Sequence, residues 1–298
     1  MNKIKIKIVC DSLSDITQDY LDLYDIEMLP ISVNIDGVEY KDRVDIEGEK
    51  FYRLLREEGL IPKTSQITYG AFYECFKSYC EKGHDILYIS AAASATGTYQ
   101  SAMLAKSELE ESYDNKIRII DSNTLCFAVA IQVIRACQLR EEGKTLDEIV
   151  DQIEAMKDMA YGCFSCDDLL YLSKGGRISS TKATIGTVLS IKPLCILKDG
   201  IVDNAGMARG KKNVAGKLVE IAKENGISSL EGRTVYIGYS DDLKERDRLE
   251  DIIRAELKPS EVRYFMIGCG IGTHGGPGTT GFICWKDQAC KEPLDSVL

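Results

Sequence analysis

Strands and helices alternate along most of this chain, and that alternation constrains the fold more than any other feature. The first segment, KIKIKIV, has the two-residue period of a strand and is followed by the capping cluster DSLSD and a short helix. Short apolar runs recur at 85–90 and 116–121 between helical segments, and a long apolar helix ends at Gly143. Such alternation predicts a mostly parallel sheet with helices on both faces.

The second half of the chain has a different pattern of predicted strands and helices. A helix over 145–159 leads to a strand at 160–166, and PLCILKDGIVDNAGMA is typical of a hairpin, which implies antiparallel pairing. Further strands are expected in TVYIGYS, EVRYFMIG and TTGFICW, with helices at 167–174, at 179–190 and from about 210. We therefore expect an α/β protein with two α/β domains, 1–155 and 156–298. The C-terminal sheet is expected to be mixed or antiparallel, with helices.

Composition excludes several classes of protein. The formal net charge of −10 argues against general binding to nucleic acid or anionic membranes. The N-terminal MNKIKIKIVC has no continuous apolar run, so we expect no signal peptide, and no membrane span is expected. Most of the 11 cysteines lie in apolar segments, which favours free thiols in a reducing cytoplasm. Cys163 and Cys166 have metal spacing, but a strand would point them to opposite faces, so they are interpreted as structural.

Polar segments follow the predicted strands. In parallel sheets, ligands bind beyond the carboxyl ends of the strands, where the loops beginning at Asp11, Ser90 and Asp121 lie. Small hydroxyl residues and a glycine at a helix start can hold an anion, or can simply cap the helix. The loop after Ser90 carries three such residues: Ser94, Thr96 and Gly97.

Three other segments are candidates for binding. GTHGGPGTTG, from Gly272 to Gly281, holds His274, one of only two histidines, in what is either a binding turn or a hinge. KTSQIT places Thr64 and Ser65 in a loop before a helix, where capping is the alternative role. Two motifs, LSKGGRIS and MARGKKN, place a basic residue near a predicted helix start. These residues, Arg177 and Arg209, are either ligands of an anion or solvated side chains.

Taken together, these segments resemble the DegV family. The motifs DSLSDIT, KTSQIT, ATGTYQSA, DSNTLC, LSKGGRIS, KPLCIL with ARGKKN, and IGTHGGPGTTG have its order and spacing over nearly the whole chain. Members of that family are fatty-acid-binding proteins that serve as acyl-binding subunits of bacterial fatty acid kinase. The resemblance implies one fatty acid between the two domains, with its chain in an apolar tunnel and its carboxylate held by hydroxyls and an imidazole.

Residue by residue, the resemblance implies carboxylate contacts from Thr64 with Ser65, from Thr96 with Gly97, and from His274. The family usually has serine before GTY in a shorter loop, so Ser94 and Thr96 both remain candidates. The two basic residues match positions near the acyl phosphate and the kinase partner: Arg177 and Arg209.

The function implied is binding of a long-chain fatty acid and its presentation to an ATP-dependent kinase subunit. We expect no catalysis by this chain alone, no cofactor and no metal. Two alternatives stay open. One is a hydrolase that pairs Ser90 or Ser94 with His274, although no G-x-S-x-G motif is present. The other is a phosphate-ligand binding module, although no G-x-x-x-x-G-K-[ST] loop is present.

Overall fold

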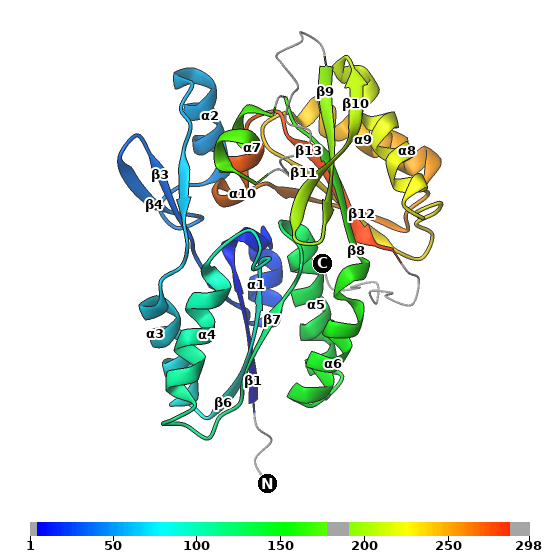
Figure 1. Ribbon diagram of the computed structural model, residues 1–298. Coiled ribbons are helices and arrows are strands. Elements are labelled where there is room, and N and C mark those ends of the chain that lie inside the picture. Colours follow the sequence, from blue (N-terminus) through cyan, green and yellow to red (C-terminus); the bar gives the residue numbers. More distant parts are fainter. Residues whose placement is uncertain (1–4, 168, 178–190, 287–298) are drawn as a thin grey trace.

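The N-terminal half is built on a four-stranded parallel sheet (Figure 1). The computed structural model describes residues 5–167, 169–177 and 191–286, so the helix expected at 179–190 lies outside the described residues. The strand order is β2-β1-β6-β7, with bounds Glu27–Leu29, Lys5–Asp11, His84–Ser90 and Ile117–Asp121. All three pairings are parallel, as the sequence predicted.

Helices cover both faces of this sheet. On one face lie α3 (Tyr69–Cys80) and α4 (Thr98–Leu109). The other face carries α1 (Gln18–Tyr24), α5 (Phe127–Glu141) and α6 (Leu146–Met156). The apolar residues of α5 are buried almost throughout because this helix packs between the two halves of the protein. None of the helices in the described parts of the chain is both long enough and apolar enough to cross a bilayer.

A small antiparallel sheet branches from the N-terminal half and stands beside the C-terminal half (Figure 1). It consists of β3 (Ser32–Ile35), β4 (Val38–Lys41) and β5 (Lys63–Ser65), with α2 (Gly48–Glu58) alongside. The Asp-Gly pair at Asp36–Gly37, a sequence typical of hairpin turns, joins β3 to β4. The KTS segment, expected as a loop, is instead a strand that pairs Thr64 with Val33.

The C-terminal half contains a six-stranded mixed sheet in the order β10-β9-β8-β13-β11-β12. The strands are, in chain order, β8 (Ala160–Ser165), β9 (Ile191–Lys198), β10 (Ile201–Arg209), β11 (Thr234–Tyr239), β12 (Glu261–Met266) and β13 (Thr280–Trp285). Only β11 and β12 pair in parallel. One face is covered by α8 (Val214–Glu224) and α9 (Leu243–Glu256), and the other face turns toward α5 (Figure 1).

Two short helices lie beside this sheet, and their positions correct the sequence interpretation. They are α7 (Leu170–Gly175) and α10 (Cys269–Gly275). The segment expected as a glycine-rich turn therefore begins inside α10, and His274 lies in the last turn of that helix. Arg209 ends β10 rather than starting a helix, since α8 begins at Val214 after a single 3₁₀ turn.

The two halves share one apolar core around α5. The ring of Phe127 on that helix lies 4.5 Å from that of Phe265 and 4.6 Å from that of Tyr236, centroid to centroid. The predicted boundary at 155/156 falls at the end of α6, between the strands of the two large sheets. It stays a prediction, because this shared core joins the parts on either side of it.

Candidate functional site

A cavity of about 440 Å³ lies between the two large sheets. The loops after β1, β6 and β7 reach it, which is the edge of the parallel sheet where the sequence placed a ligand. Two carboxylates, Asp11 and the half-buried Asp121, hold two of these loops in place. Asp11 accepts hydrogen bonds from the Tyr88 hydroxyl at 2.6 Å and the Ala91 amide at 3.1 Å, and Asp121 accepts one from the Ala93 amide at 3.2 Å.

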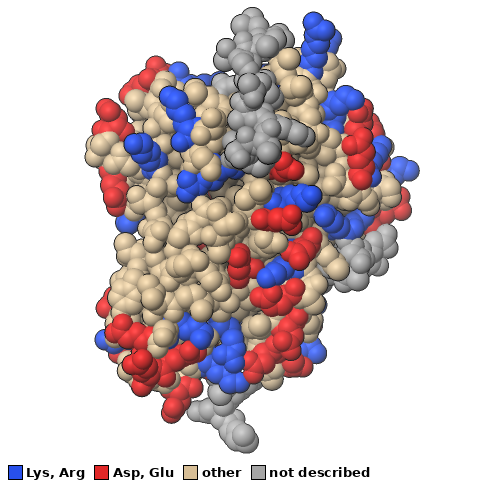
Figure 2. Space-filling view, in the orientation of Figure 1, with Lys and Arg blue, Asp and Glu red and all other residues tan. Residues whose placement is uncertain are grey.

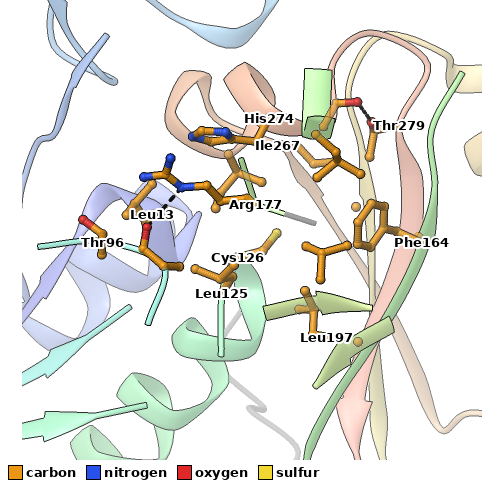
Figure 3. A pocket seen from close by; sticks show the side chains of 18 of the residues that line it. Leu13, Thr96, Leu125, Cys126, Phe164, Arg177, Leu197, Ile267, His274 and Thr279 are labelled. Carbon is orange, nitrogen blue, oxygen red and sulfur yellow. Dashed lines mark hydrogen bonds between the residues drawn. The ribbon is translucent and has the colours of Figure 1, made fainter. Parts of the chain in front are cut away.

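One end of the cavity is polar. Its lining includes Thr64, Ser65, Gln66, Thr96, Gly97, Arg177 and His274. Figure 3 shows Thr96, Arg177 and His274 on one side, opposite Phe164 and Leu197. The structure thus brings together side chains from β5, the start of α4, the end of α7 and α10. Gln66 was not predicted from the sequence, although its neighbours Thr64 and Ser65 were.

The His274 ring links two of these segments. Its Nε2 lies 3.1 Å from Thr64 Oγ1, while Nδ1 is buried without a hydrogen-bond partner among the described residues. Nδ1 faces Gly175, where a Cβ atom would lie only 2.1 Å from it, so the glycine makes room for the ring. Burial, with a smaller contribution from Arg177, lowers the pKa of His274 to about 4. The imidazole is therefore neutral at physiological pH.

Thr96 and Ser94 occupy different positions. Thr96 lines the cavity next to Gly97, at the N-terminus of α4, where the helix dipole favours a negative group. Its hydroxyl lies 2.9 Å from that of Thr98. Ser94 is exposed, does not line the cavity, and donates a hydrogen bond to the Gly200 carbonyl at 3.1 Å. Of these two candidates, only Thr96 faces the space in which a ligand fits.

The structure does not bring the two candidate arginines together. Arg177 lines the cavity and donates to the carbonyls of Ala95 at 3.1 Å and Gly175 at 2.6 Å. It is the one permanently charged side chain among the described lining residues. Arg209 is exposed at the end of β10 and is not part of the lining.

The other end of the cavity is apolar. Its walls come from the loop before α5, from β8, from the β9–β10 hairpin and from β13, through Leu125, Cys126, Phe164, Leu197, Val202, Phe282 and Ile283 among others. Thr279 adds a hydroxyl to the lining, but that hydroxyl already donates to the carbonyls of Gly275 at 2.8 Å and Gly276 at 2.9 Å. No charged group accompanies these residues in the described wall, so this end suits a hydrocarbon chain.

The serine-hydrolase alternative lacks the required geometry within the described residues. Ser90 is fully buried and its hydroxyl donates to the Ala91 carbonyl at 2.8 Å, so neither it nor Ser94 pairs with His274. No cluster of His, Cys, Asp and Glu in the described chain could hold a metal ion. Cys163 and Cys166 are both buried, and neither forms a disulfide with another described cysteine.

The glycines near His274 also have a packing role that the sequence did not reveal. Gly272 lies against α2, and a Cβ there would meet the Tyr52 hydroxyl at 2.3 Å. The same hydroxyl donates to the Ile267 carbonyl at 3.0 Å. Glycine at this position therefore lets α10 approach α2 closely, which fixes the helix that carries the imidazole.

A family model described as "Uncharacterised protein, DegV family" matches residues 5–287. The chain belongs to the DegV family. A DegV domain-containing protein of Clostridium perfringens is 36% identical over 293 residues, which cover 97% of this chain and 99% of the relative.

Solved structures of the family have the same fold. A DegV family protein from Thermus thermophilus, described by its fatty acid binding, is 30% identical with a TM-score of 0.85. The match covers 95% of this chain and 99% of that one. A stearic acid-binding protein from Eubacterium ventriosum is 28% identical with a TM-score of 0.82, with 94% and 98% of the two chains covered.

Proposed function

We propose that this DegV protein binds one long-chain fatty acid in the cavity between its two large sheets. The observation that carries the proposal is the polarity of that cavity. Hydroxyls, an imidazole and one arginine converge at one end, and the remaining described wall is almost entirely apolar. A fatty acid has this same division between an anionic head and a hydrocarbon tail.

The head group is proposed to lie among Thr64, Ser65, Thr96, Gly97 and His274. Hydroxyl and imidazole donors each contribute about 0.5–1.5 kcal/mol net, and more when the acceptor is charged. Because the imidazole is neutral, it cannot balance the carboxylate charge. Arg177 lines the same end of the cavity, and we propose that it balances this charge in addition to its part in phosphoryl transfer.

Mass spectrometry of the protein purified from bacteria and then denatured tests the ligand class. We expect a fatty acid of long chain length at close to one molecule per chain. A protein that carries no fatty acid, and that also fails to bind added palmitate, would contradict the proposal. Hydrolysis of an activated ester at a rate above that in buffer alone would instead favour the serine-hydrolase alternative.

We further propose that the chain catalyses nothing alone and presents the carboxylate, in the bacterial cytoplasm, to an ATP-dependent kinase subunit. The exposed Arg209 suits an acidic partner or an incoming phosphoryl group. On the face shown in Figure 2, acidic and basic side chains surround a broad uncharged area at mid-height, which leaves room for a protein partner.

A reconstituted kinase assay separates the two arginines. We expect Arg209→Ala to bind palmitate like the parent but to be phosphorylated more slowly, and Arg177→Ala to lose both affinity and phosphorylation. Arg254→Ala on α9, far along the chain from both, is the matched control and should change neither. If Arg209→Ala is phosphorylated at the parent's rate, the partner role of that residue is wrong.

A further inference from the structure

A second, smaller hollow adjoins the apolar end of the ligand cavity. It has a volume of about 200 Å³ and is bordered by the loop after β7, the turn after α6, β8 and the β9–β10 hairpin, so both halves of the protein contribute to it. Among the described residues, Leu197 on β9 is the one that lines both this hollow and the ligand cavity. The boundary between the two spaces therefore includes this one leucine.

The neighbours of Leu197 on the sheet fix its position. It pairs with Val202 across the β9–β10 hairpin, and a Cβ atom at Gly162 on β8 would lie only 2.8 Å from its Cδ1. The leucine thus packs on the bare backbone of Gly162, where a larger residue would displace it. Figure 3 shows Leu197 across the cavity from His274. Leu197 therefore closes the cavity on the side away from the proposed head-group site.

The hollow differs in chemistry from the cavity that it adjoins. The apolar end of the cavity has no charged group in its described wall, whereas the hollow has more positive than negative side chains in its lining: Lys157, Lys198, Lys286, Asp158 and Asp199. The Lys286 ammonium lies 5.7 Å from the centre of the Tyr161 ring, at the inner wall of the hollow. A carboxylate is costly to bury against hydrocarbon and is stabilised beside an ammonium group. The two spaces therefore suit different chemical groups.

We propose that Leu197 selects the tail of the ligand, because it limits the length of the acyl chain and rejects a chain that ends in a second carboxylate. This inference deepens the proposed function and rests on it. A chain can extend through the apolar end until its terminal methyl group contacts Leu197, and further methylenes require that side chain to move. A terminal carboxylate at the same place would contact the leucine, while the lysines of the hollow lie behind it.

Leu197→Ala tests the inference with two ligand series, the monocarboxylic acids from myristate to behenate and the α,ω-dicarboxylic acids of the same lengths. Displacement of a fluorescent fatty acid gives each affinity. In the parent, affinity should rise with length to a maximum and then fall, and each diacid should bind about 100-fold or more weakly than its monoacid, since a charge is buried against hydrocarbon. In the variant, the maximum should move to longer chains. The penalty on the second carboxylate should shrink about tenfold or more, because the chain can reach the lysines.

Leu125→Ala is the matched control. It removes the same three carbon atoms from another leucine of the apolar end, one that does not border the hollow. It enlarges the cavity without joining the two spaces, so the penalty on the second carboxylate should stay at the parent's value.

The outcomes separate this inference from the proposed function. A diacid penalty in Leu197→Ala equal to that of the parent would overturn the selection against polar tails, and an unmoved length maximum would overturn the limit on chain length. An equal loss of the penalty in Leu125→Ala would also overturn the inference, because general loosening of the cavity would then be the cause. In each of these cases palmitate binding by the parent leaves the proposed function standing. If the parent binds no member of either series, the proposed function fails and this inference fails with it.

Leu197→Val covers the case in which the alanine variant does not fold. Valine is apolar, suits a strand and is one carbon shorter than leucine. The length maximum and the diacid penalty should shift in the same directions as in the alanine variant, by smaller amounts. Affinities identical to those of the parent across both series would count against the role of Leu197.

Discussion

The two ends of the cavity are built in different ways. The polar end is assembled from short segments, β5, the start of α4, the end of α7 and α10, each supplying one or two side chains. Strands β8 and β13 and the β9–β10 hairpin form much of the apolar end, as parts of the C-terminal core. The polar end can therefore fix the orientation of a ligand through a few hydrogen bonds, while the apolar end can bury its hydrocarbon surface. Affinity and orientation are expected to come from different parts of the protein.

Shortening the acyl chain should have the largest effect. Burial contributes about 0.8 kcal/mol per CH₂, so octanoate should bind up to about 6 kcal/mol more weakly than palmitate. Displacement of a fluorescent fatty acid over a series of chain lengths measures this slope. Alcohols of the same lengths keep the tail and lose the carboxylate charge, so they should give the same slope with a uniform loss. Equal affinities for octanoate and palmitate would show that the apolar end does not hold the tail.

Candidates for the polar end could be named from the sequence, whereas the residues of the apolar end could not. Hydroxyls, glycines and a rare histidine stand out beside apolar segments, and the resemblance to the DegV family then favoured Thr64, Thr96 and His274 over their alternative roles in caps and turns. Leu197 and Val202 could not, because a cavity wall and a packed core use the same residue types.

Contacts that join distant segments were also beyond prediction. The Cys269 amide at the start of α10 donates a hydrogen bond to Asp42, 227 positions away in the sequence. No local sequence pattern predicts such a contact. In the same way, the pairing of Thr64 with Val33 joins strands 31 positions apart, and the KTS segment was expected as a loop. The parallel sheet and the hairpins were predictable because the spacing of apolar residues and the turn residues are local features of the sequence.

Removing the imidazole should have an intermediate effect. His274→Ala is expected to weaken palmitate binding by about 1–3 kcal/mol, because a donor at the head group is lost and Thr64 is left without its partner. The fold should persist, since the start of α10 is held by Asp15 and Asp42 rather than by the ring. Calorimetric titration gives the affinity and thermal unfolding gives the stability. His84→Ala, at the start of β6 and outside the cavity, is the control and should bind normally.

The smallest effect distinguishes two neighbouring hydroxyls in the loop before α4. Thr96→Val preserves the shape of the side chain but removes a hydroxyl that faces the polar end, and should weaken binding by about 1 kcal/mol. Ser94→Ala removes a hydroxyl that bonds to the Gly200 carbonyl outside the cavity, so affinity should stay at the parent's value. Calorimetric titration of both variants with palmitate gives the comparison. The reverse order of losses would mean that this loop rearranges around the ligand, and the carboxylate contact would then belong to Ser94.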